Sequence, residues 1–515
     1  MSPAYLFLVL LLLACFIAVM LAPLYVFRIR RNVVRYMGQR IRPLSVAVPV
    51  VERQGGAPLH LANEAAPRTP LSDAGRALVD RMRNVRRSAA AMYFLAGVAA
   101  ASVLAAGEYA ATGEWSPLMV AYIWPAVLTV STVAVPALRK RALVLGVSGL
   151  TLFGTLVGTL AVTNVEEAAI NAFFGFLIPP TILLLLVANR ANRTIAPVLV
   201  LIGTIVAGAI TAGVAAGGFG SFLAVLVTGL VALALLALGL LTLALLPWAY
   251  ERKYFSELSF QLAFAWVVFA VAYGMTRNTL HFWLCGALSL AVYAGLTRRM
   301  LPRLQGAARG HRPASLLVLR VFGSPGRSAR LLAHIGMRWR TVGPIHLIAG
   351  SDTAITNLDL SEVFRFLTFR LRSVYVQDAA DLERRLEKLD CAPDPDGRYR
   401  VNDYFCFDDT WKATFTELLN RSDAILLDLS GFGSKNAGVA FELGRLLGSR
   451  PLGSFVVITD GKTDIDCLGA TLTRLWQQLD PSAPNAAVEQ PVLRVLHKPP
   501  AHRLVAALCD AVAAD

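Results

Sequence analysis

The sequence predicts a polytopic α-helical membrane domain of about nine spans, followed by a cytoplasmic α/β domain with a doubly wound, mostly parallel sheet. Two observations carry this prediction. Residues 1–300 consist mainly of long uncharged apolar runs, and a membrane-spanning helix needs roughly 20 apolar residues. From about residue 315, short apolar runs alternate with amphipathic ones, as strands alternate with helices in a parallel sheet.

The composition agrees with a membrane protein. Of the 515 residues, 56% are hydrophobic and only 16% are charged, whereas soluble domains carry about 25% charged residues. We expect the spans at about 4–26, 89–107, 116–136, 142–163, 168–188, 194–215, 220–247, 258–275 and 279–297. The first is expected to be a retained anchor, because its apolar run is longer than that of a signal peptide and arginines follow it.

The charge of the loops orients these spans. The segment 28–87 and every second loop after it are rich in Lys and Arg, and the loops between them are not. Because cytoplasmic loops collect Lys and Arg, we expect the N-terminus outside and the C-terminal domain in the cytoplasm. The net charge of +15 is then mostly a topology signal, and no nucleic-acid partner is expected.

These observations divide the chain into an N-terminal anchor span (1–27), a basic cytoplasmic loop (28–88), an eight-span membrane domain (89–297), a basic linker (298–312) and the α/β domain (313–515). Within the loop, Val46 to Pro70 is rich in Ala, Pro and Gly and is expected to be irregular. Leu71 to Arg87 suits a basic amphipathic helix, either lying on anionic lipid or solvated. The spans hold almost no ionisable side chains, which disfavours a proton-coupled transporter. The cysteine and histidine spacings predict no metal site.

Periodicity predicts the elements of the α/β domain. Strands are expected at 315–322, 343–350, 399–407, 424–430, 455–460 and 492–497, and helices at 328–340, 360–371, 378–390, 410–422, 436–448, about 467–479 and 500–512.

Polar residues that follow these strands are candidates for a ligand site, because doubly wound sheets bind ligands beyond the carboxyl ends of their strands. They are Gly323, Ser324 and Arg327 after the first strand, Asp352 after the second, Asp408 after the extended segment, Asp428, Ser430 and Asn436 after the central strand, and Glu442 on the next helix. Carboxylates gathered in a partly apolar pocket should differ in pKa, as acid and nucleophile pairs need. The alternatives are helix caps for Asn436 and for the aspartates at 352, 409 and 460, and for Glu442 a buried salt bridge with Arg445.

The run from Ser422 to Gly444, SDAILLDLSGFGSKNAGVAFELG, resembles the signature of the nucleoside 2-deoxyribosyltransferase-like superfamily and its TIR-like relatives. The resemblance implies that Glu442 is the nucleophile at a sugar anomeric carbon, and that Asp428 and Asn436 bind sugar hydroxyls. Three features depart from it. The loop RVFGSPGR (320–327) lacks the aromatic or acidic residues expected for a base pocket, residues 352–410 look like an insertion, and the helix before Glu442 lacks the tryptophan common in TIR enzymes. The wider pattern resembles uncharacterised bacterial multi-pass membrane proteins, which implies the bacterial inner membrane.

Two function hypotheses follow. In the first, the cytoplasmic domain binds a nucleotide such as NAD as ligand or substrate, rather than as a cofactor, and Glu442 and Asp428 form the catalytic pair that cleaves its N-glycosidic bond. In the second, the membrane domain is a sensor and the α/β domain is a non-catalytic module that self-associates or docks a partner. The expected partners are the lipid bilayer, a nucleotide and further copies of the chain.

Overall fold

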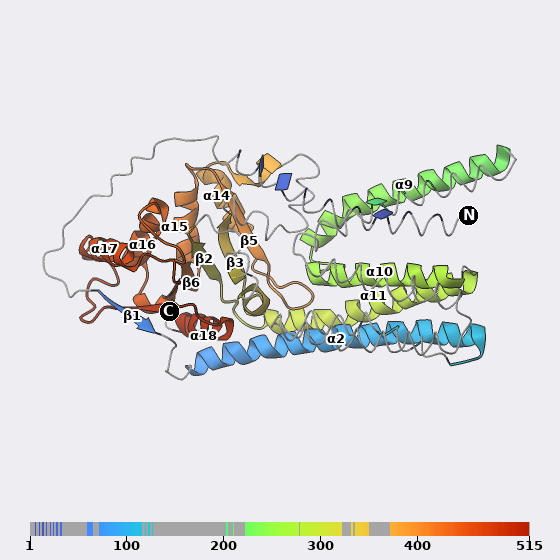
Figure 1. Ribbon diagram of the computed structural model, residues 1–515, viewed down its shortest axis with the longest axis horizontal. Helices are drawn as coiled ribbons and strands as arrows, with labels where there is room; N and C mark the ends of the chain where they lie inside the picture. The colour runs from blue at the N-terminus through green and yellow to red at the C-terminus, as the bar shows by residue number, and fades with distance from the viewer. Residues whose placement is uncertain are drawn as a thin grey trace.

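The computed structural model describes residues 59–64, 72–115, 222–277, 279–321, 335–349 and 371–513, together with isolated positions elsewhere. These residues form an α/β part and a bundle of long helices, which lie end to end (Figure 1). The candidate site residues Gly323, Ser324, Arg327 and Asp352 lie outside the described residues, as does the predicted helix at 360–371 apart from its last residue.

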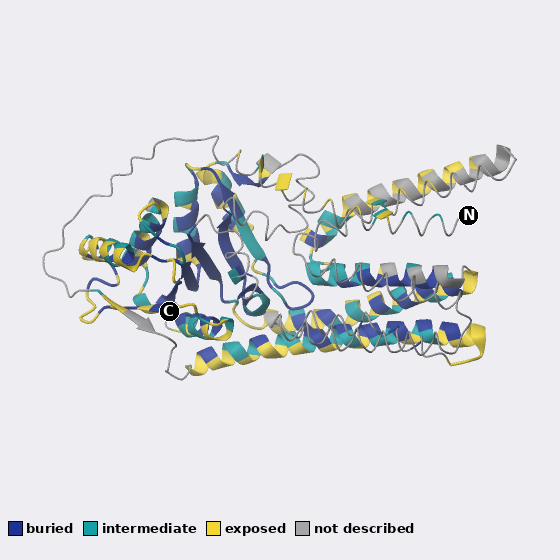
Figure 2. Cartoon of the chain, viewed as in Figure 1, coloured by how far each residue is buried: buried dark blue, intermediate teal, exposed yellow. Residues whose placement is uncertain are grey.

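A parallel sheet forms the centre of the α/β part. Its strands are β1 (His60–Glu64), β2 (Leu316–Arg320), β3 (Ile345–Ala349), β4 (Tyr375–Val376), β5 (Val401–Cys406), β6 (Ala424–Asp428), β7 (Phe455–Thr459) and β8 (Val492–His497). They lie in the order β1-β8-β7-β6-β2-β3-β5-β4. Every residue of β2, β3, β6 and β7 is buried (Figure 2), as expected for a parallel sheet that is covered on both faces. The predicted parallel sheet is confirmed.

Helices cover both faces of this sheet. The buried side chains of α14 (Ala379–Glu387), α15 (Trp411–Arg421), α16 (Ala437–Ser449) and α17 (Ile465–Gln477) share one apolar core. A second core, on the opposite face, contains α18 (Ala501–Ala513), the helical residues 335–339 and the beginning of α2 (Asp73–Thr112). Two short 3-10 helices, η2 (Leu371–Val374) and η3 (Leu452–Ser454), lead into β4 and β7.

The chain winds over the sheet in two directions from its centre. After β2 it crosses the α18 face and forms β3 on one side, whereas after β6 it crosses the opposite face as α16 and forms β7 on the other side. β2 and β6 are neighbours, and the two directions therefore separate between them. This is the topological switch point, where doubly wound sheets bind their ligands.

An unexpected strand extends the sheet at the β8 edge. Residues 60–64 were expected to be irregular, yet they form β1 and pair with β8 from His60 opposite Val492 onward. The run HLANE has no apolar alternation by which it could be recognised as a strand. The predicted loop 28–88 therefore contributes to the same sheet as the C-terminal domain.

The helix predicted at 71–87 is the first part of α2, which continues without a break to Thr112. Ser72 caps its beginning by accepting a hydrogen bond from the Gly75 N–H at 3.0 Å, and the Ser72 hydroxyl donates to Asp510 on α18 at 2.8 Å. Met82 is buried in the core of the α/β part. The apolar side of this segment thus packs against protein.

The second part of the molecule contains α2, α9 (Phe222–Glu251), α10 (Glu257–Arg277) and α11 (Leu280–Arg309). α2, α10 and α11 run side by side (Figure 1), and Trp266 and Tyr293 pack between them with ring centroids 5.4 Å apart. Two described helices, Asp73–Thr112 and Leu280–Ala307, are long and apolar enough to cross a membrane.

The described residues do not support the expectation of nine spans. Four of the predicted segments, 89–107, 220–247, 258–275 and 279–297, fall on α2, α9, α10 and α11. The other five lie wholly or mostly outside the described residues, and the described helices do not support the number nine.

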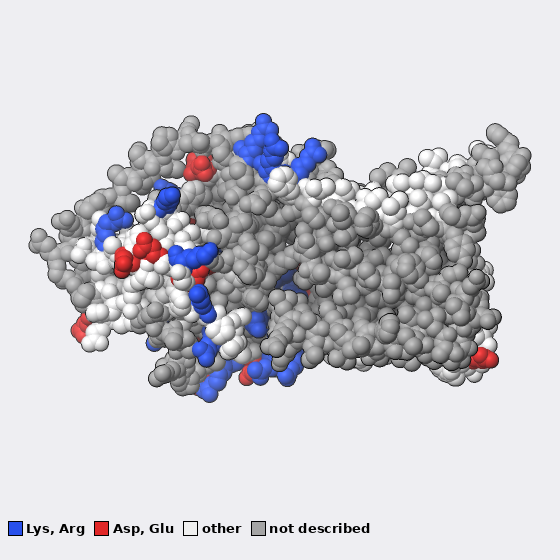
Figure 3. Space-filling model, viewed as in Figure 1, with Lys and Arg blue, Asp and Glu red and all other residues white. Residues whose placement is uncertain are grey.

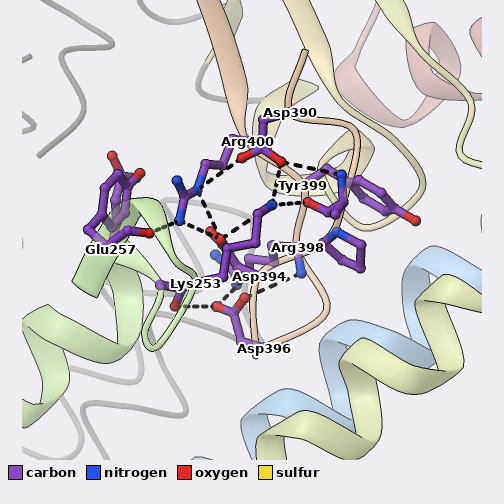
Figure 4. A network of polar contacts seen from close by, with 12 residues as sticks. Lys253, Glu257, Asp390, Asp394, Asp396, Arg398, Tyr399 and Arg400 are labelled. Carbon is purple, nitrogen blue, oxygen red and sulfur yellow. Dashed lines mark hydrogen bonds and ion pairs between the residues drawn. The ribbon is translucent and has the colours of Figure 1, made fainter. Parts of the chain in front are cut away.

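A polar network joins the two parts (Figure 4). Lys253, in the turn between α9 and α10, lies 2.5 Å from Asp390 and 3.9 Å from Asp394. Arg400 is 2.9 Å from Asp394 and donates to the carbonyl of Tyr250 at 2.6 Å. The segment Asp390–Arg400, between α14 and β5, is therefore anchored to the end of the bundle. The insertion expected at 352–410 thus supplies β4, α14, β5 and this contact.

Further contacts surround this pair of cations. The Ser256 hydroxyl donates to Asp396 at 2.8 Å, the Arg340 guanidinium lies 3.5 Å from Glu257, and Gln305 donates to the carbonyl of Pro393 at 2.8 Å. We call the charged residues of this region the junction network: Lys253, Glu257, Arg340, Asp390, Asp394, Asp396, Arg398 and Arg400.

The junction network lies at the amino ends of the strands. Arg400 immediately precedes β5, and α11 leads into β2 through residues 310–315. Because the strands are parallel, their carboxyl ends lie on the far side of the sheet, roughly 15 Å away for strands of this length. The bundle and the candidate site therefore lie at opposite edges of one sheet.

Candidate functional site

Two charged residues end the two strands at the switch point. Arg320 is the last residue of β2, Asp428 is the last residue of β6, and the two are opposite each other in the sheet. Their exposed fractions are only 3% and 4%. Asp428 thus lies at the ligand-binding edge that the sequence predicts for it. Arg320 was missed; the signal that identifies it is a lone cation in an apolar strand, which needs a polar partner when it is buried.

Glu442 occupies a core position of α16. Val439 and Leu446 share its face at helical spacing, and both are buried, as is the neighbouring Leu443. The exposed fraction of Glu442 is 3%. Its Oε2 atom is buried and has no hydrogen-bond partner among the described residues.

The environment of Glu442 favours its neutral form. Burial raises the pKa of its carboxyl group to about 8, and the positive charge of Arg320 acts in the opposite direction. The group is therefore mostly protonated at neutral pH. The alternative of a salt bridge with Arg445 is not observed, since Arg445 is exposed and forms no ion pair with Glu442.

The loop after β6 is held in place by the loop after β7. Gly431 has φ 77°, a conformation that glycine adopts without a steric penalty. Its N–H donates to Asp460 at 3.0 Å, and the Thr463 hydroxyl donates to the carbonyl of Leu429 at 2.9 Å. Asp460 therefore connects two loops instead of capping a helix.

Ser430 and Asn436 lie within this tied loop. The Ser430 N–H donates to Asp428 Oδ1 at 3.0 Å. Asn436 stands at the start of α16, but its Oδ1 accepts from the Gly433 N–H at 2.9 Å and makes no bond to the helix. Asn436 is therefore the N-cap residue of α16, as the alternative for it states, but its side chain closes the preceding loop instead of bonding to the helix.

Aromatic packing fixes the rotation of α16. The Phe441 ring meets Trp411 edge-on at a centroid distance of 5.5 Å, and Phe415 at 6.1 Å. Both partners lie on α15. Because Phe441 is directed towards α15, the neighbouring Glu442 is directed towards the sheet.

Asp408 lies farther from this group. It is exposed in the turn between β5 and α15, and β2 and β3 separate β5 from β6. At about 4.8 Å per strand, the distance across the sheet is roughly 14 Å. Asp408 therefore belongs to the same edge but does not join Arg320, Asp428 and Glu442, which we call the switch-point triad.

The switch-point triad can support chemistry on a sugar. A neutral Glu442 can donate a hydrogen bond, and an ionised Glu442 can attack or stabilise an electron-poor anomeric carbon. Within the described part of the chain, no group of three or more His, Cys, Asp or Glu side chains is arranged to hold a metal ion.

Comparison of the chain with known protein families, curated proteins and solved structures gave no match. The resemblance of the run Ser422–Gly444 to the deoxyribosyltransferase-like and TIR-like proteins stays a prediction from the sequence.

Proposed function

We propose that this chain is a multi-pass inner-membrane protein whose cytoplasmic α/β domain binds a nucleotide such as NAD at the switch point, with Glu442 as nucleophile at the N-glycosidic bond. The observation that carries this proposal is the buried carboxyl group of Glu442, which has an unpartnered oxygen among the described residues. Burying such a group opposes folding. Strongly perturbed carboxyl groups of this kind are concentrated at functional sites.

The membrane location is supported by the contrast between the two parts. Most charged side chains visible in Figure 3 lie over the α/β part, and the described surface of the bundle is largely white. β1 and the start of α2 come from the predicted basic loop and pack on the α/β part. That arrangement agrees with a loop and a C-terminal domain on the same, cytoplasmic side.

The chemistry of NAD suits a carboxyl group with a raised pKa. The ribose of NAD is joined to a cationic nicotinamide ring, and positive charge develops on the anomeric carbon as the bond breaks. A cation beside Glu442 would stabilise its carboxylate, so that the nucleophile forms in the complex. The oxygen of Asn436 already accepts a hydrogen bond from Gly433, whereas its amide nitrogen can donate to a sugar hydroxyl.

Nicotinamide release by the detergent-purified full chain tests the proposal. We expect Glu442→Gln to lower the rate at least about 100-fold, as for a lost nucleophile. Glu417→Gln is the matched control, because Glu417 lies on the adjacent helix α15 and its side chain is 45% exposed. The activity of this variant should match that of the wild type. The proposal fails if wild type and Glu442→Gln are equally inert and no nucleotide raises the thermal stability of either.

A second candidate is a non-catalytic membrane sensor whose α/β domain self-associates or docks a partner. The observation that favours it is the junction network, which ties the sheet firmly to the bundle. Such a contact suits transmission between the two parts. An oligomer of fixed size whose stability does not respond to nucleotides would support this candidate over the first.

A further inference from the structure

Three arginines from separate segments meet where α2 leaves the α/β part. Arg86 lies on α2, Arg338 on the helical residues 335–339, and Arg398 in the segment Asp390–Arg400. All three are half-buried. The charges of Arg338 and Arg398 act on Arg86 more strongly than any other charge of the described residues. We infer from this that the three side chains lie close together. We call these three residues the arginine cluster.

Apolar packing fixes two of these segments against each other. Met82 precedes Arg86 by one helical turn and therefore lies on the same side of α2. It is buried in the same core as Trp339, the residue after Arg338. Trp339 is itself held by a hydrogen bond from its indole N–H to the carbonyl of Ala314 at 3.0 Å.

A tight turn seats the third segment on α2. Gly397 has φ 76°, and a Cβ atom at this position would lie 3.2 Å from Val85 and 3.2 Å from Leu304. Val85 precedes Arg86, and Gly397 precedes Arg398. Packed apolar side chains and the close approach of the Gly397 backbone to α2 therefore bring the three segments of the arginine cluster together.

Among the described residues, the charges that act most strongly on Arg86 are those of other arginines. Burial lowers the pKa of Arg86 most. The positive charges of four other arginines, at positions 338, 398, 87 and 83, lower it further. Within the part of the chain that the structure describes, Arg86 Nε is buried without a hydrogen-bond partner. Asp396, in the same turn, is 3.9 Å from Arg398 and also accepts a hydrogen bond from the Ser256 hydroxyl.

We propose that the arginine cluster binds a phosphate group, and that this phosphate belongs to the headgroup of an anionic phospholipid. Guanidinium groups bind phosphate through paired, charge-assisted hydrogen bonds, and a buried cation needs a counter-charge. Arg86 lies three residues before the predicted span 89–107, which is the level of the headgroups. The choice of a lipid rests on the proposed membrane location, whereas the phosphate site itself does not.

The thermal stability of the full chain in a non-ionic detergent tests this site. Short-chain phosphatidylglycerol, short-chain phosphatidylcholine and inorganic phosphate are added separately to wild type, Arg86→Gln and Arg76→Gln. Arg76 is the matched control, because it lies on the same helix with 61% of its side chain exposed. Wild type and control should be stabilised by phosphatidylglycerol and far less by phosphatidylcholine.

Arg86→Gln should give an unusual pair of effects. Without lipid its melting temperature should rise, because a cation that is repelled by its neighbours has been removed. With phosphatidylglycerol its apparent affinity should fall about tenfold or more, since charge-assisted bonds to phosphate are lost. An arginine with a purely structural role would instead lower the melting temperature and leave the lipid response unchanged, and this result would overturn the proposal.

The remaining outcomes separate the two sources of phosphate. An equal response to inorganic phosphate, lost in Arg86→Gln, would support the phosphate site and overturn the lipid assignment. Recovery of the chain in the soluble fraction of cells would contradict the proposed membrane location. It would overturn the lipid assignment, whereas the proposal of a phosphate site would still stand.

Discussion

The junction network and the switch-point triad each contain a buried carboxyl group, Asp394 and Glu442, but only that of Asp394 has ion-pair partners among the described residues. Asp394 is completely buried and is met by Arg400 at 2.9 Å and by Lys253 at 3.9 Å. Glu442 is almost as deeply buried, and no ion pair joins it to any described residue. Burial raises the pKa of Asp394 to about 6, with Arg400 opposing the rise, and raises the pKa of Glu442 to about 8.

This difference distinguishes a carboxyl group that stabilises the fold from one that serves a ligand. A buried carboxylate with cations beside it holds two parts of a protein together. Removing one partner leaves the other charge buried without a counter-charge. A buried carboxyl group without such a partner opposes folding and persists where a ligand uses it. The protein should therefore lose stability when the junction network is mutated, and gain stability when Glu442 is replaced by a neutral residue.

The largest expected effect is at the junction. Asp394→Ala removes the carboxylate between Arg400 and Lys253, and leaves the buried Arg400 and the half-buried Lys253 without it. The free energy of unfolding should fall by about 3–5 kcal/mol. Thermal or denaturant unfolding of the full chain measures this loss, and a change below about 1 kcal/mol would show that the network does not hold the two parts together.

The next effect has the opposite sign. Glu442→Gln removes a group whose folded-state pKa, about 8, lies above its ordinary value of 4.5. The folded wild type holds this proton more tightly than the unfolded chain, so the destabilisation by Glu442 grows as the pH rises from about 4.5 to about 8. The variant should be more stable than the wild type by about 2–4 kcal/mol at pH 8 and about equal at pH 4.5. A constant difference between melting temperatures across this range would rule out a buried, unpaired Glu442.

The same titration predicts the pH dependence of catalysis. If the ionised carboxyl group is the nucleophile, the rate of nicotinamide release at low NAD concentration should rise with pH, reach half its maximum near pH 8 and level off above about pH 9. A rate that is constant between pH 6 and pH 9 would assign the step to another group.

A smaller effect is expected at Gly397, which seats the junction segment on α2. Gly397→Ala places a side chain in a left-handed conformation, at φ 76°, and within 3.2 Å of Val85 and Leu304. Each contribution is about 1 kcal/mol, so the stability should fall by roughly 1–3 kcal/mol. Denaturant unfolding measures the loss. An unchanged midpoint would mean that the turn accommodates the added methyl group without loss of stability.

The smallest effect is expected at an exposed pair on α2. Arg83 and Asp80 are 3.4 Å apart, with 52% and 65% of their side chains exposed. Solvent screens such pairs, and Asp80→Ala should change the stability by less than about 0.5 kcal/mol. The same unfolding measurement then calibrates the effects of the buried charges.

Much of the α/β fold can be predicted from the sequence, because buried parallel strands are continuous apolar runs. The runs at 424–430 and 455–460 became β6 and β7 with nearly the expected bounds. β1 could not be predicted in this way: it lies at the edge of the sheet, where His60 and Leu61 remain exposed. Edge strands are held by backbone hydrogen bonds to a distant segment, which local periodicity does not reveal.

The candidate site could be predicted in position but not in composition. Asp428 and Glu442 are visible in the sequence as carboxylates within apolar elements. Arg320 became relevant only because β2 and β6 are neighbours although more than 100 residues separate them in the chain. Asn436 was assigned a capping role from its position alone, and its bond to Gly433 depends on the loop geometry.

The most direct test compares the melting temperatures of wild type and Glu442→Gln at pH 8, with and without NAD. We expect the variant to melt at a higher temperature than the wild type without NAD, and NAD to stabilise the wild type much more than the variant. A variant that melts at a lower temperature than the wild type, together with a wild type that does not respond to NAD, would contradict this expectation and make Glu442 part of the scaffold.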